Sequence, residues 1–87
     1  MPPQFGSVPQ GLLVGGIWVP VSSSNVDAAR RVGPDLEVRF LAKGKQPRRT
    51  WRYPGAAGEL ANLVNAPSAG KFVKWTLRRL YGDGVEV

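Results

Sequence analysis

The chain of 87 residues contains no cysteine and no histidine. Without cysteine it has no disulfide bond and no thiolate ligand for a metal, and without histidine it lacks the commonest general base and metal ligand. Its six acidic residues form no metal-ligand spacing, and the serine run at residues 22–24 has no obvious activating base. We therefore expect no metal, no cofactor and no enzymatic activity.

Long hydrophobic runs are also missing. No apolar run approaches the roughly 18–20 residues of a membrane-spanning helix, and no charged segment precedes "GLLVGGIWV" as it would in a signal peptide. The hydrophobic content of 43% is ordinary for a folded chain. We expect one soluble, cytoplasmic domain with a single modest core and no membrane partner.

Acidic charge is scarce where basic charge is dense. The formal net charge is +6, and residues 39–79 hold ten lysines and arginines against the single acid Glu59. Such a balance favours an anionic partner, either nucleic acid or an acidic protein surface.

The N-terminal part cannot form a long helix, because its first 22 residues include four prolines and four glycines. We predict an extended arm over residues 1–20 and a folded domain over residues 21–87. Within the arm, "GLLV" and "GIWVPV" are candidate short strands, and Pro20 limits the second to a sheet edge.

The middle of the chain predicts a small antiparallel sheet of about three strands. "VDAARRV" fits a strand or one helical turn, with the strand favoured, and "GPD" at 33–35 indicates a turn. In "LEVRF" apolar and charged residues alternate, as a half-buried strand requires. In "TWRY", Trp51 and Tyr53 point one way while Thr50 and Arg52 point the other, so the two segments predict a hairpin with a cationic tip.

Two helices are predicted after the sheet, which makes the fold class α+β. The first lies in "PGAAGELANLVNAP", where apolar residues recur at helical spacing before Pro67. The second spans residues 69–81, with Ser68 as its N-cap and Gly82 at its C-terminal end.

At about 100° per residue, the second helix has a core face and a basic face. The core face contains Phe72, Val73, Thr76, Leu77, Leu80 and Tyr81. The basic face contains Lys71, Lys74, Arg78 and Arg79, with Trp75 between Lys71 and Arg79. Trp75 is therefore predicted to point outward, where it stacks on a base, anchors a protein partner, or lies under the arm or on neighbouring aliphatic stems.

Two further groups of residues are candidate contacts. Ser68, Gly70 and Lys71 surround the free N–H groups at the start of the helix, a corner that either holds a phosphate or is an ordinary cap. It is not a Walker A loop, since the spacing fails and Phe72 replaces the hydroxyl that would hold magnesium. The hairpin carries Lys43, Lys45, Arg48, Arg49 and Arg52, which form a solvated loop or share one phosphate-binding face with the helix.

The order of these pieces resembles the KTSC domain family, named from its attachment to the C-terminus of some lysyl-tRNA synthetases. The resemblance covers about residues 21–81 and rests on "VSSSNV", "DLEVRF", "WRYPG" and "LVNAPSAGKFVKWTLRRLY". In the last segment the family's run fits Ala66, Ser68, Gly70, Lys71, Phe72, Leu77, Arg78 and Tyr81. The chain departs from the family in "AARRVGP", in a longer basic hairpin loop and in its N-terminal arm, departures that a specialised partner would explain.

The resemblance implies a compact α+β unit, with a small antiparallel sheet followed by two helices. Family members next to a tRNA-handling enzyme, and freestanding ones in bacteria and phages, suggest nucleic-acid binding by association. Our leading hypothesis is a module for RNA or single strands, in which lysines and arginines hold phosphates while Trp75, with Trp51, stacks on bases. The alternative is a protein-interaction module, such as a phage-encoded modulator of host transcription or translation.

Overall fold

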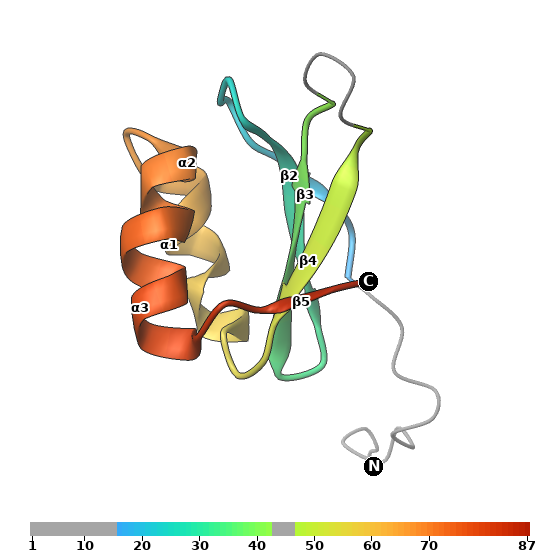
Figure 1. The fold of residues 1–87 in the computed structure, drawn as a ribbon, viewed down its shortest axis with the longest axis vertical. Coiled ribbons are helices and arrows are strands. Elements are labelled where there is room, and N and C mark those ends of the chain that lie inside the picture. The colour runs from blue at the N-terminus through green and yellow to red at the C-terminus, as the bar shows by residue number, and fades with distance from the viewer. Residues whose placement is uncertain (1–15, 43–46) are drawn as a thin grey trace, which may run out of the picture.

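A computed structural model describes residues 16–42 and 47–87 of the chain. In this part the chain forms a five-stranded antiparallel sheet in the order β1-β2-β3-β4-β5, with helices covering one of its faces (Figure 1). The strands are β1 (Val19–Pro20), β2 (Val26–Val32), β3 (Asp35–Phe40), β4 (Arg49–Tyr53) and β5 (Val85–Glu86). The helical elements are a 3-10 turn (Ala57–Glu59), α1 (Leu60–Asn65), α2 (Ala69–Phe72), a π-helical turn (Val73–Leu77) and α3 (Arg78–Tyr81). The α+β class is confirmed, with more strands than the predicted three.

The β2–β3 hairpin confirms the strand interpretation of "VDAARRV". Val32 pairs with Asp35, so only two residues form the turn. The first of them, Gly33, has a φ of 57°, a conformation that glycine adopts without strain. The turn predicted at "GPD" therefore sets the register between β2 and β3.

The β3–β4 pair follows the predicted alternation. Val38 pairs with Trp51 and Leu36 with Tyr53, and these residues face the helices. Arg52 pairs with Glu37 and ion-pairs with it on the opposite face. The predicted cationic tip of this hairpin, with Lys43 and Lys45, lies outside the described residues.

The two additional strands are short and lie at the sheet edges. β1 lies within the candidate strand "GIWVPV" and pairs with Ala28 and Ala29 of β2, which confirms a short strand there with Pro20 at a sheet edge. Residues 19 and 20 of the predicted arm therefore join the sheet. Residues 1–15, which include "GLLV", lie outside the described part. β5 pairs with β4 after a close approach at Gly84, whose φ is 75° and where a Cβ would lie 2.9 Å from Cε1 of Tyr53.

The core lies between the helices and the sheet. Its largest fully buried side chains are Leu36, Leu63, Leu77, Val26 and Val38. They come from β2, β3, α1 and the π-helical turn, so the C-terminal part of the chain contributes to the same core as the sheet. Each such side chain stabilises the fold by about 1.5–3 kcal/mol through burial.

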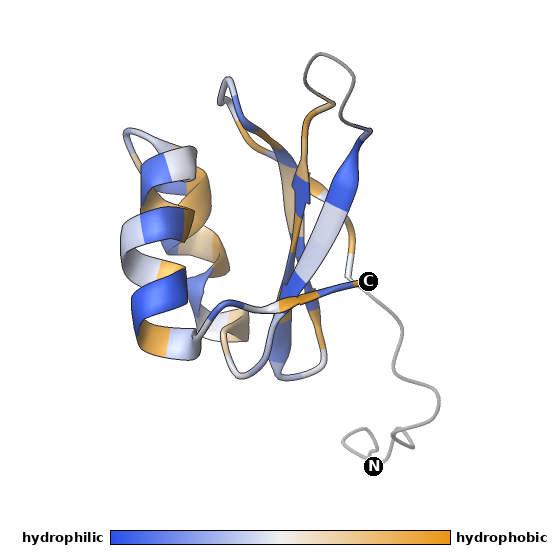
Figure 2. Ribbon diagram, viewed as in Figure 1, coloured by the Kyte–Doolittle hydropathy of each residue, from blue (hydrophilic) through white to orange (hydrophobic). Residues whose placement is uncertain are grey.

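The second predicted helix is continuous over residues 69–81 and is called the C-terminal helix below. It begins after Ser68, whose hydroxyl accepts a hydrogen bond from the Lys71 N–H at 3.4 Å, and ends before Gly82, whose φ is 86°. Both predicted ends are confirmed. Figure 2 shows hydrophilic residues, in blue, recurring along this helix.

The prediction that Leu80 belongs to the core face is wrong, because this side chain is 64% exposed. The prediction assumed α-helical spacing throughout. In the π-helical turn the Arg78 N–H donates to the carbonyl of Val73, five residues earlier, so this turn holds more residues than an α-helical turn. Val73 and Leu77 stay buried, but the residues after them rotate, and Leu80 lies at the outer surface.

The outer face of the sheet, opposite the helices, carries a network of charged groups around Glu37. This carboxylate is 2% exposed and accepts hydrogen bonds from Arg30 Nε at 2.8 Å and Arg52 Nη2 at 2.7 Å. Burial by itself would raise the pKa of Glu37, but the hydrogen bonds and charges of the two arginines outweigh it and lower the pKa below its ordinary value. Trp18 lies on this network, with the guanidinium carbons of Arg30 and Arg39 each 4.4 Å from its ring centroid.

Candidate functional site

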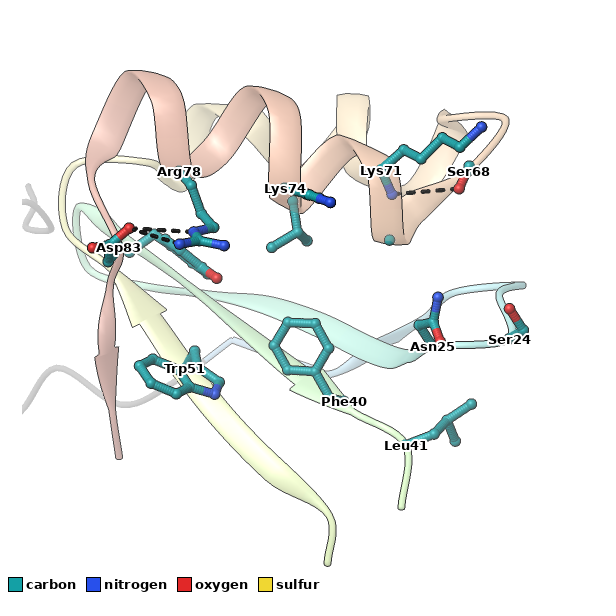
Figure 3. A pocket seen from close by; sticks show the side chains of 13 residues that line it. Ser24, Asn25, Phe40, Leu41, Trp51, Ser68, Lys71, Lys74, Arg78 and Asp83 are labelled. Carbon is teal, nitrogen blue, oxygen red and sulfur yellow. Dashed lines mark hydrogen bonds and ion pairs between the residues drawn. The ribbon is translucent and has the colours of Figure 1, made fainter. Parts of the chain in front are cut away.

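A groove of about 820 Å³ lies between the sheet and the C-terminal helix (Figure 3), and it is called the sheet–helix groove below. One wall comes from β3 and β4, and the other from the helix. The two walls differ in chemistry, since the sheet contributes aromatic rings and the helix contributes cations.

The aromatic wall is formed mainly by Phe40 and Trp51. Phe40 pairs with Arg49 and Val38 pairs with Trp51, so the two rings are diagonal neighbours on the same face of adjacent strands. Both are half-buried and pack against the core. Each ring is therefore held in place by the fold while part of it faces the groove (Figure 3).

The cationic wall consists of Lys71, Lys74 and Arg78, whose spacing of three and four residues places them along one side of the helix. Arg78 Nη2 lies 3.2 Å from Oδ1 of Asp83, which is 82% exposed, so this ion pair is weak and Arg78 can exchange its partner. Neither lysine has a carboxylate within 4.0 Å among the described residues, which include all six acids of the chain. This wall keeps a net positive charge.

The polar end of the groove is where the start of the helix approaches Ser24 and Asn25. A Cβ on Gly70 would lie 2.8 Å from Nδ2 of Asn25, so glycine permits this approach. The Ser68 hydroxyl already accepts the Lys71 N–H. Two of the three residues proposed as a phosphate corner, Ser68 and Gly70, thus have structural roles while also lining the groove.

Trp75 lies outside the groove and is 63% exposed, which confirms the predicted outward position. Nζ of Lys74 is 5.2 Å from its ring centroid. A shallower depression, called the outer depression below, is lined by Lys74, Trp75, Arg78, Arg79 and Asp83. Lys74 and Arg78 line both the groove and this depression.

The hairpin cations are not brought into the groove. Arg48 lies 3.7 Å from Asp27, Arg49 lies 3.0 Å from Glu86, and Arg52 lies 2.7 Å from Glu37. Each is paired with a carboxylate, and Arg52 points to the outer face of the sheet. The described members of the hairpin therefore do not join the helix cations in one surface; Lys43 and Lys45 lie outside the described residues.

Sequence reasoning missed several residues that line the groove, among them Asn25, Phe40 and Tyr53. The alternation of β3 and β4 contained a usable signal, because it places Phe40, Trp51 and Tyr53 on one face.

Burial raises the pKa of Tyr53, an effect that nearby Arg78 reduces and Asp83 adds to, so its phenol is protonated at neutral pH. The charged groups that face the groove are then the helix cations and Asp83.

Within residues 16–42 and 47–87, no three carboxylates gather at a site that could hold a metal ion. In the same residues, no helix has both the length and the apolar character needed to cross a bilayer.

Comparison of the chain with protein-family models, curated proteins and solved structures finds no match. The resemblance to the KTSC family thus stays a prediction from the sequence.

Proposed function

We propose that the protein is a non-enzymatic binding module for single-stranded nucleic acid, with RNA favoured, and that it binds the strand in the sheet–helix groove. The observation that carries the proposal is the pairing of an aromatic wall with a cationic wall across one groove. Proteins that bind single strands combine these two features, because bases stack on aromatic side chains while phosphates follow a positively charged groove.

The two walls make separate energetic contributions. A base stacked on Trp51 is worth about 1–3 kcal/mol, largely independent of sequence. Contacts of Lys71, Lys74 and Arg78 with phosphates release counterions, and three such contacts on a single strand give a slope of log affinity against log salt of about −2. The proposed function therefore has a quantitative salt signature.

The proposed site differs in two respects from the one expected from the sequence. It does not include the described arginines of the hairpin, Arg48, Arg49 and Arg52. Trp51 and Phe40 take the main stacking role because they lie inside the groove, whereas Trp75 lies on the other side of the cations. The resemblance to the KTSC family supports nucleic acid as the ligand by association only.

Fluorescence anisotropy with labelled single-stranded RNA and DNA tests the proposal. Trp51→Ala and Lys74→Glu are each expected to weaken binding, the first by removing a stacking surface and the second by reversing a charge in the groove. Arg48→Glu is the matched control, because it changes the net charge equally at a side chain that lies outside the groove and is 57% exposed.

The proposal is wrong if neither groove variant weakens binding, or if Arg48→Glu weakens it as much as Lys74→Glu. The second of these results would mean that only the overall charge matters. The wild-type salt slope is a further check, since binding that does not respond to salt contradicts phosphate contacts.

A second candidate function, protein interaction, is favoured by the exposure of Trp75. Tryptophan and arginine are over-represented among the residues that dominate protein interfaces, and Trp75 lies beside Arg79. If this candidate is correct, a tagged protein recovers one stoichiometric acidic partner from nuclease-treated lysate, and Trp75→Ala abolishes the recovery. Loss of the partner on nuclease treatment would instead favour nucleic acid.

A further inference from the structure

The sheet–helix groove and the outer depression are separated by a ridge of two cations. Lys74 and Arg78, one α-helical turn apart in sequence, are the side chains that line both hollows together with Asp83. Trp51 lies in the groove on one side of this ridge, and Trp75 lies in the depression on the other side. Two aromatic surfaces thus lie on the two sides of a shared positive ridge.

We propose that a single strand crosses this ridge, so that one base stacks in the groove on Trp51 while another stacks outside it on Trp75. This inference rests on the proposed function and specifies its ligand. The ligand is an oligonucleotide long enough to reach both tryptophans, since a mononucleotide occupies only one hollow.

The ridge suits a phosphate that links the two bases. Lys74 has no carboxylate within 4.0 Å in the described part of the chain, and the pair between Arg78 and Asp83 is exposed to solvent. Nζ of Lys74 lies 5.2 Å from the Trp75 ring centroid, so a phosphate bound by Lys74 lies next to that ring. Cations in such positions bind the backbone without selecting a base.

The fold also fixes the position of Trp75 in the outer depression. Val73 and Leu77, which flank Trp75 in the π-helical turn, are buried in the core and fix this turn against the sheet. Trp75 is 63% exposed between them, and Arg79 beside it has no carboxylate partner among the described acids. π-Helical turns are often found at functional sites, and this one carries both Lys74 and Trp75.

A length series of single-stranded oligonucleotides, from the mononucleotide upward, tests the inference by anisotropy or calorimetry. For wild type we expect a rise in affinity at the length that reaches the second tryptophan, of about five- to 150-fold for one additional stacked base. Trp75→Ala is expected to remove this rise and to leave the affinity for the shortest ligands unchanged. Trp51→Ala is expected to weaken binding at every length.

Leu80→Ala is the control for truncation of an exposed apolar side chain on the same helix. It should leave the whole length series unchanged, and an effect equal to that of Trp75→Ala would overturn the inference. Thermal unfolding of Trp75→Ala and Leu80→Ala should resemble that of wild type, because these side chains are 63% and 64% exposed. The same measurement checks that Trp51→Ala, whose ring packs against the core, is folded.

The failure of this inference is distinguishable from the failure of the proposed function. If Trp51→Ala and Lys74→Glu weaken binding but Trp75→Ala has no effect at any length, the strand stays in the groove and the crossing is refuted. If Trp51→Ala and Lys74→Glu have no effect, the proposed function itself fails.

Discussion

Replacing Glu37 by glutamine tests the charged network on the outer face of the sheet. The wild-type carboxylate accepts hydrogen bonds from Arg30 at 2.8 Å and from Arg52 at 2.7 and 3.1 Å, and its side chain is 3% exposed. Glutamine keeps the shape but removes the charge, so both arginines lose their counterion.

The magnitude follows from the number of arginines that lose a charged acceptor, which is two, and from the exposure of their side chains. Hydrogen bonds to charged groups contribute about 1.5–3 kcal/mol each. The side chains of Arg30 and Arg52 are 28% and 39% exposed, so solvent screens both and the lower end applies. We expect Glu37→Gln to lower the free energy of unfolding by about 2–3 kcal/mol at pH 7, a large part of the 5–15 kcal/mol of a typical domain.

The loss should depend on pH in a defined direction. In the unfolded chain the pKa of Glu37 is about 4.3, and in the folded protein it is lower, so the unfolded state binds the proton more readily. The stabilisation is complete well above the unfolded pKa and disappears as the pH falls through the folded pKa. The difference in unfolding free energy between wild type and Glu37→Gln should therefore shrink between neutral pH and strong acid.

Urea unfolding followed by circular dichroism at a series of pH values measures this difference. Asp83→Asn is the control, because its ion pair with Arg78 is exposed and should contribute less than about 1 kcal/mol. A gap between wild type and Glu37→Gln that stays constant or widens on acidification would refute the reasoning, since the carboxylate would then lack the lowered pKa.

Four further variants test three other parts of the structure. Leu77→Ala should lower the unfolding free energy by about 2–5 kcal/mol, and Leu80→Ala should lower it by less than about 0.5 kcal/mol. Equal losses for the two variants in urea unfolding would contradict the π-helical turn. Trp18→Ala should cost about 1–2 kcal/mol through its two cation–π contacts but leave oligonucleotide affinity unchanged, because Trp18 lies on the outer face; a weakened affinity would contradict that position. Gly70→Ala should change the unfolding free energy by less than about 1 kcal/mol, because the higher helix propensity of alanine offsets the displacement of the Asn25 side chain. A loss of several kcal/mol would show that Asn25 cannot move.

The parts of the fold that local rules control were predictable from the sequence. Alternation placed Leu36, Val38 and Trp51 on the inner face of the sheet, and the cap residues set both ends of the C-terminal helix. These features depend on neighbours a few residues away, which the sequence displays directly.

The C-terminal edge strand β5 and the phase of the last helical turn were not predictable in the same way, whereas β1 lies within the candidate edge strand "GIWVPV". β5 has two residues and no alternation to detect, and it depends on the approach of Gly84 to Tyr53. Leu80 is exposed because the π-helical turn changes the helix phase, and no residue pattern announces that turn. Both features arise from packing between segments that are distant in the sequence.

In the candidate site, too, only the features that depend on local spacing were predictable from the sequence. The outward position of Trp75 followed from helical spacing, and the shared orientation of Trp51 and Tyr53 from strand alternation. The partners of the hairpin cations followed from neither, because Arg52 meets Glu37 only once the β3–β4 register is known. The groove itself also required the position of the helix over the sheet.

The groove has one wall from the β3–β4 hairpin and the other from a helix whose buried side chains are Ala69, Val73 and Leu77. Opening of that helix alone would remove the binding site while the hairpin stayed paired. A bound strand is therefore expected to slow hydrogen exchange most at the amides of residues 69–81, because ligand binding opposes the openings that destroy its own site.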